Sequence, residues 1–165
     1  MNATIGLYGL GTCLLAATMV VSPAGPSWFE ARTTGARELT LSGAAEFGLV
    51  GANDSTGPFV ITLGAESPTG AVVFTRQSTF RPGPGVYRLG ENPAETIQAL
   101  VVTGSPEWPT GAYRARAGSL TITRSEGDYV AGHFEIQAVG YDADDPLDEA
   151  RTLSVQGTFT ALPTH

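Results

Sequence analysis

The chain has 165 residues, of which 42% are hydrophobic and 15% charged. This balance excludes an intrinsically disordered chain that charge repulsion keeps unfolded. Its net charge of −7 argues against nucleic-acid binding, which needs clustered basic side chains to neutralise phosphates. All nine basic residues are arginines, so mechanisms that need a Schiff-base lysine or a P-loop lysine are excluded.

Residues 1–24 have the character of a secretory signal peptide. Residues 5–21 carry no charge, and small residues at 22–24 offer a cleavage site, although the usual basic stretch before the apolar run is missing. We expect export to the periplasm, the cell surface or the medium, with no membrane span in the mature chain. The alternatives are retention as a buried or anchoring helix and acylation at Cys13. Cleavage near residue 24 would leave no cysteine, and therefore no disulfide or thiol chemistry.

Residues 25–37 are expected to form an extended linker, and residues 38–162 a single domain. From residue 38, short apolar runs alternate with turns rich in Gly, Pro, Asn and Asp, without a pattern typical of a three-turn helix. This predicts an all-β fold, an antiparallel β-sandwich of jelly-roll or immunoglobulin-like type with about nine short strands. The predicted strands are 38–49, 58–63, 71–76, 85–89, 97–103, 112–117, 119–124, 129–141 and 151–161.

The clearest strand pattern lies in the C-terminal third. Apolar or small residues alternate with polar ones along 129–141 and again along 151–161, as in strands with one buried face. Residues 119–124 join the first of these strands through a short turn. Together they predict a three-stranded antiparallel meander with one face in water.

Parts of this meander resemble the closing strands of uncharacterised exported bacterial all-β domains. The matching segments are GSLTIT at 118–123, VAGHFEI at 130–136 and VQGTF at 155–159. In those domains the patterns G-x-L-x-I-T, V-x-G-x-F-x-F and V-x-G-x-F recur, and PGVY at 84–87 is similar to their P-x-G-x-Y entry. The resemblance implies a sandwich-like fold and an envelope or secreted location. It implies no catalytic residue.

His133 and Glu135 are the first candidate pair for chemistry. Residues two apart on a strand point to the same face, so these side chains could share a metal ion or a proton. A zinc site needs at least one more strong ligand, and the only other histidine is the terminal His165. We therefore favour the alternative, a polar pair on the wet face of a strand.

An acidic loop follows the same strand. Asp142, Asp144, Asp145 and Asp148 supply hard oxygen donors, which calcium prefers. The glycine and the glutamate that an EF-hand loop carries at its sixth and twelfth positions are absent. The loop is thus either a partial calcium ligand set or a solvated turn, and no other cofactor is expected.

Other residue types give weaker signals. No Gly-x-Ser-x-Gly elbow is present, so a hydrolase would have to combine His133 with acids from other strands. Trp28, Trp108 and the tyrosines could form a sugar-stacking surface or fill the core. Arg114 and Arg116 should project from one face, where they either grip an anion or, as we favour, pair with surface acids.

These patterns favour an exported, non-catalytic β-sandwich module of the cell envelope or the secreted fraction, with a structural or ligand-binding role. One alternative is a calcium-assisted domain that binds carbohydrate or another surface ligand. The other alternative is a hydrolase built around His133. The partner stays open between a carbohydrate and an envelope protein.

Overall fold

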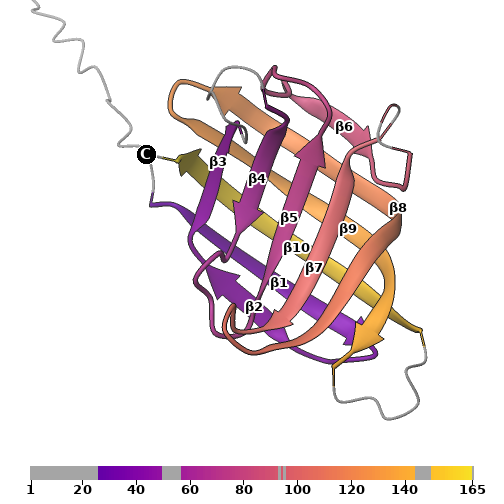
Figure 1. Cartoon of the computed structure of the whole chain (residues 1–165). Coiled ribbons are helices and arrows are strands. Elements are labelled where there is room, and N and C mark those ends of the chain that lie inside the picture. The colour runs from indigo at the N-terminus through magenta and orange to yellow at the C-terminus, as the bar shows by residue number, and fades with distance from the viewer. Residues whose placement is uncertain (1–25, 50–56, 93, 95, 144–149, 165) are drawn as a thin grey trace, which may run out of the picture.

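The computed structural model describes residues 26–49, 57–92, 94, 96–143 and 150–164; the predicted signal segment 1–24 lies outside this part of the chain. The described residues form ten strands and are all-β, which confirms the predicted antiparallel β-sandwich (Figure 1). The strands are β1 (Trp28–Gly35), β2 (Thr40–Gly43), β3 (Ala45–Leu49), β4 (Phe59–Leu63), β5 (Gly70–Arg76), β6 (Gly85–Arg88), β7 (Gln98–Gly104), β8 (Pro109–Glu126), β9 (Tyr129–Asp142) and β10 (Arg151–Pro163).

The strands form one continuous sheet that folds into two layers. Antiparallel pairing joins β3, β4, β5, β7, β8, β9 and β10 in that order, and β1 pairs with both β2 and β10. The last residues of β10 run parallel to β3 and so connect the two ends of this path. In Figure 1, β3, β4, β5 and β7 lie in front, and β1, β2, β9 and β10 cross behind them.

The core lies between these layers. Phe74 of β5 contacts Phe134 of β9 edge to face, with 5.2 Å between ring centroids, and Phe134 lies 6.4 Å from the ring of Phe159 on β10. All three side chains are almost fully buried. Along each strand, the residues that alternate with the buried core residues point outward. Their side chains form the outer face of each layer.

The prediction that residues 25–37 form an extended linker was wrong. Residues 28–35 form β1, which pairs with β10 along its whole length and with β2 on its other side. Phe29, Ala31 and Thr33 are buried, and the residues between them are exposed. This period-two alternation is visible in the sequence, and it places the start of the sheet at Trp28 and not at residue 38.

Two strand boundaries also differ from the prediction. The predicted strand 38–49 is divided at Ala44 into β2 and β3, while the predicted strands 112–117 and 119–124 are one strand, β8. Gly118 allows β8 to continue, because a Cβ at this residue would lie 2.1 Å from the carbonyl oxygen of Glu135, and its φ is +131°. Because β8 is this long, it pairs with β7 in its first half and with β6 in its second half.

The predicted C-terminal meander is confirmed. β8, β9 and β10 are consecutive antiparallel neighbours. Phe134 and Ile136 are buried, whereas His133 and Glu135 are exposed, as the alternation predicted. The threonine and glutamine side chains of β10 also lie on the outer face.

Candidate functional site

The outward side chains of β1, β10 and β9 form what we call the polar face. Side chains at paired positions lie on the same side of a sheet, so the strand register shows which of them are neighbours. Successive rows are about 7 Å apart along the strands. One row consists of Glu30, Thr158 and His133, and the next consists of Arg32, Gln156 and Glu135.

The polar face is hollowed into a shallow groove of about 520 Å³. The six side chains of the two rows line it, together with Ala31, Phe134 and Gly157. Phe134 and Ala31 point into the core, so the polar side chains offer the hydrogen-bonding groups of the groove. These groups include donors, acceptors and charges of both signs, which suits a ligand with many hydroxyl or amide groups.

Trp28 lies on the same face, two residues before Glu30 on β1, and pairs with Thr160 of β10. Its side chain is 42% exposed. An exposed indole beside polar groups can cover the apolar face of a ligand ring while its neighbours make hydrogen bonds. Trp28 was among the aromatic candidates in the sequence, whereas Glu30 and Arg32 were missed because they fall in the predicted linker 25–37.

The prediction that His133 and Glu135 share an outward face is confirmed, and the fold brings Glu30 and Arg32 to that face as well. Within the described residues, no group of three or more His, Cys, Asp or Glu side chains could hold a metal ion. The other histidine, His165, lies outside these residues. The described polar face therefore supplies no third ligand for a zinc site of the predicted kind.

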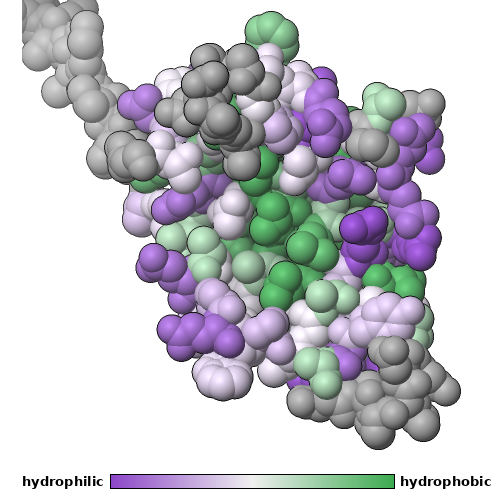
Figure 2. Space-filling view, viewed as in Figure 1, coloured by the Kyte–Doolittle hydropathy of each residue, from purple (hydrophilic) through white to green (hydrophobic). Residues whose placement is uncertain are grey.

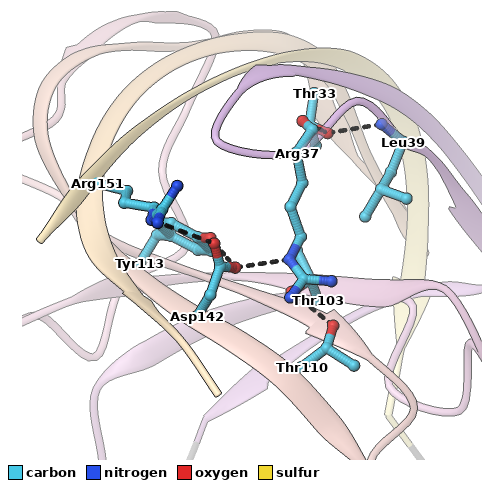
Figure 3. Close-up of polar contacts among 8 residues, drawn as sticks. All are labelled: Thr33, Arg37, Leu39, Thr103, Thr110, Tyr113, Asp142 and Arg151. Carbon is cyan, nitrogen blue, oxygen red and sulfur yellow. Dashed lines mark hydrogen bonds and ion pairs between the residues drawn. The ribbon is translucent and has the colours of Figure 1, made fainter. Parts of the chain in front are cut away.

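Asp142 lies at the end of β9 in a polar network that the sequence did not predict (Figure 3). Its carboxylate accepts a hydrogen bond of 2.6 Å from Nε of Arg37 and another from the phenol of Tyr113. Nε of Arg151 lies 3.9 Å from the second carboxylate oxygen. The Asp142 side chain is only 11% exposed. The network thus connects the segment between β1 and β2 to β8, β9 and β10.

The predicted calcium ligands fall partly outside the described residues. Asp144, Asp145 and Asp148 lie outside them, and only Asp142 lies within. Both oxygens of Asp142 face guanidinium groups, so a calcium ion bound there would have to displace an arginine. Calcium binding by the loop stays a prediction, and the described contacts of Asp142 are those of a structural anchor.

Burial and the contacts among Asp142, Tyr113 and Arg37 shift the pKa values of all three side chains. Burial alone would raise the pKa of Asp142, but hydrogen bonds from Tyr113 and Arg37 and the nearby positive charges outweigh it and hold that pKa below its ordinary value of 3.8. Burial, followed by the hydrogen bond to Asp142, raises the pKa of Tyr113 to about 12. The hydrogen bond to Asp142 raises the pKa of Arg37. At neutral pH the network therefore contains an ionised Asp142 and a neutral Tyr113.

We expect the network to lose its contribution to folding stability at both ends of the pH scale. The Asp142 contribution is present above pH 3.8 and is lost as the pH falls through the lowered pKa of the folded state. The Tyr113 contribution is present below pH 10.0 and is lost as the pH rises towards about 12. Urea unfolding across this range measures both losses. Tyr113→Phe should reduce the alkaline loss, and an alkaline loss of unchanged size would contradict this assignment.

Arg114 and Arg116 do not act as a pair. A β-bulge falls between Ala115 and Ala117, so the register shifts at Arg116. Arg116 forms an ion pair with Glu91, with 2.5 Å between Arg116 Nη1 and Glu91 Oε1. Because both side chains are about half exposed, this pairing adds little stability. It is the surface ion pair that we favoured for Arg116, whereas Arg114 stays exposed on the front layer.

Comparisons with protein-family models, curated proteins and solved structures gave no match for this chain. Among the described residues, no helix is long and apolar enough to span a membrane. The case for a function therefore rests on the polar face, the Asp142 network and the outer face of the opposite layer.

Proposed function

We propose that this chain is an exported β-sandwich module that binds a polar ligand, such as a carbohydrate chain, along the polar face and performs no catalysis. The observation that carries the proposal is the groove of about 520 Å³ with polar side chains from three strands. A sandwich can hold such a face rigidly, because the core side chains on the opposite side of the same strands are packed.

A carbohydrate suits this face for two reasons. Sugar hydroxyls both donate and accept hydrogen bonds, and carboxylate, guanidinium, amide and hydroxyl groups on the face can satisfy both roles. The apolar side of a sugar ring can stack on an exposed aromatic ring, and Trp28 offers one on the same face. The groove is shallow and open, which fits a chain that lies across the strands.

Export rests on the uncharged N-terminal segment and the small residues after it. A module of the envelope or the secreted fraction would meet cell-surface or environmental polysaccharides directly. The absence of cysteine after residue 24 also fits a domain that depends on its core, and not on disulfides, for stability.

The hydrolase alternative would use His133 with an acid from another strand. Glu30 of β1 lies in the same row, and Glu135 on β9 would supply the second carboxyl group. The two glutamates lie two strands apart and one row apart, which places their Cα atoms about 12 Å from each other. An acid and a base that act on one glycosidic bond are usually about 5–9.5 Å apart at their carboxyl groups. These values do not decide the matter, because glutamate side chains span several ångströms. We favour binding without bond cleavage because Glu30, His133 and Glu135 are all exposed in an open groove, whereas a general acid is normally held away from water.

A single-tryptophan variant tests the proposed site. The chain has two tryptophans, so Trp108→Phe leaves Trp28 as the only one. We expect its fluorescence to change saturably when cellohexaose, xylohexaose or chitohexaose is added, with a Kd of about 10 μM to 1 mM for at least one of them. In the same background, Glu135→Gln should weaken that binding about tenfold, because it removes one charged hydrogen-bond acceptor.

The matched control is Trp28→Phe, which keeps Trp108 as the only tryptophan and should show no saturable change. A response of equal size in this control, or no response of the Trp28 reporter to any of the three sugars, would contradict carbohydrate binding at the polar face. Recovery of the bound hexasaccharide intact is expected after long incubation. Its cleavage would support the hydrolase alternative.

A further inference from the structure

The front layer carries an exposed apolar patch on its outer face, opposite to the polar face. Figure 2 shows hydrophobic side chains gathered at the centre of the face that β4, β5 and β7 form. Six outward positions of these strands and of β8 are apolar where a solvated sheet would carry polar residues, and Leu100 is 40% exposed. The patch consists of Val60, Ala71, Val73, Leu100, Val102 and Ala112.

One row of paired residues crosses this patch from an acid to a base. The row runs through Glu46 of β3, Thr62 of β4, Val73 of β5, Leu100 of β7 and Arg114 of β8. Four strand spacings separate its ends, or about 19 Å. The row therefore has a negative end, a positive end and, between them, Thr62 and the apolar residues Val73 and Leu100.

Neither charged end of this row has an ion-pair partner among the described residues. The ion pairs found there involve other arginines, namely Arg37, Arg116, Arg124 and Arg151. Within one copy of the sheet, Glu46 and Arg114 are too far apart to form an ion pair with each other. The strand order fixes the distance between them.

We infer that the apolar patch is a docking surface for a second copy of this chain. A twofold axis that lies in the interface and runs along β5 would reverse the row of one copy over the row of the other. Glu46 of each copy would then lie opposite Arg114 of the other copy, Val73 would face Val73, and Leu100 would face Thr62. An axis across the strands would instead place like charges opposite each other, which is unfavourable.

This arrangement agrees with the way in which sheets pack. Two sheets related by an axis along their strands keep their strand directions nearly aligned, and face-to-face sheets lie about 10 Å apart. Glutamate and arginine side chains can span that gap together. The patch has six apolar residues, whereas a standard interface has about 20–30 residues on each side, so the dimer should be weak and depend on concentration.

The inference is independent of the proposed function, because the patch and the polar face lie on opposite layers. A dimer formed through the front layers leaves both grooves exposed on its outer sides. Two grooves on one particle would raise the apparent affinity for a polymeric ligand without any new contact.

Sedimentation velocity of the full chain tests the dimer. We expect the weight-average sedimentation coefficient to rise between about 10 μM and 1 mM chain. Glu46→Arg and Arg114→Glu should each lower the association constant at least tenfold, because each places two pairs of like charges in the interface. Leu100→Asp should abolish the rise by burying a carboxylate in the apolar centre. All three positions lie on the sheet surface, and circular dichroism checks that each variant folds.

Mixing the two charge variants tests whether both ends of the row lie in the interface. An equimolar mixture of Glu46→Arg and Arg114→Glu restores opposite charges at both ends of the interface, so it should associate like the unmodified chain. The matched control Glu135→Arg makes the same charge change on the polar face and should leave association unchanged. No rise with concentration in the unmodified chain, or a mixture as weak as the separate variants, would overturn the inference.

Discussion

Replacing Asp142 by alanine is expected to lower the free energy of unfolding by about 2–4 kcal/mol. The substitution leaves the phenol of Tyr113, which is fully buried, without its acceptor. It also leaves the guanidinium of Arg37 without the carboxylate that it contacts at 2.6 Å. Urea unfolding at neutral pH measures the loss as a lower midpoint at an unchanged slope.

A double-mutant cycle separates this network from a general effect of changing β9. Asp142→Ala and Tyr113→Phe should be coupled by about 1 kcal/mol or more, since each removes one partner of the same hydrogen bond. Glu135→Ala on the same strand removes an exposed carboxylate and should change stability by less than about 0.5 kcal/mol. Equal losses for Asp142→Ala and Glu135→Ala would show that the network does not stabilise the fold.

Replacing Phe134 by alanine is expected to cost about 3–5 kcal/mol. Phe134 is 1% exposed, and its ring contacts Phe74 of the front layer and Phe159 of the neighbouring strand. The packed layers can collapse only partly into the space that the ring leaves, so the cost includes a cavity as well as lost burial. The midpoint of urea unfolding again provides the measurement.

Phe80→Ala is the matched control for this substitution. Phe80 is 78% exposed, so removing the same ring there should change stability by less than about 0.5 kcal/mol. Phe134→Leu should cost less than Phe134→Ala, because it keeps most of the buried volume. Similar losses for Phe134→Ala and Phe80→Ala would mean that the two layers do not pack through this aromatic cluster.

The two proposals concern different layers of the sandwich. The back layer presents the groove with Glu135 and Trp28, and the front layer presents the apolar patch around Leu100. Each face consists of the alternate residues of strands whose other residues form one shared core. Substitutions on either face should therefore change binding or association without unfolding the domain, which allows the two proposals to be tested separately.

Much of the fold could be predicted because strand formation has a local signal. The alternation along 129–141 and 151–161 predicted the outward positions of His133 and Glu135 correctly. The same signal was present in WFEART, but an assumed linker hid it, so Glu30 and Arg32 were missed. The predicted break between strands at residue 118 was wrong, because Gly118 instead allows the backbones of β8 and β9 to approach closely.

By itself, the sequence determined that the domain described here is all-β. It also determined where most strands lie and which of their residues face outward, since a period of two depends only on neighbouring residues. Only the tertiary structure decided which strands lie side by side. Arg37 and Asp142 are 105 residues apart in the chain, yet they share a hydrogen bond. The row from Glu46 to Arg114 likewise exists only through the order and register of five strands. Such pairings depend on how the whole sheet closes around its core, and no local pattern contains that information.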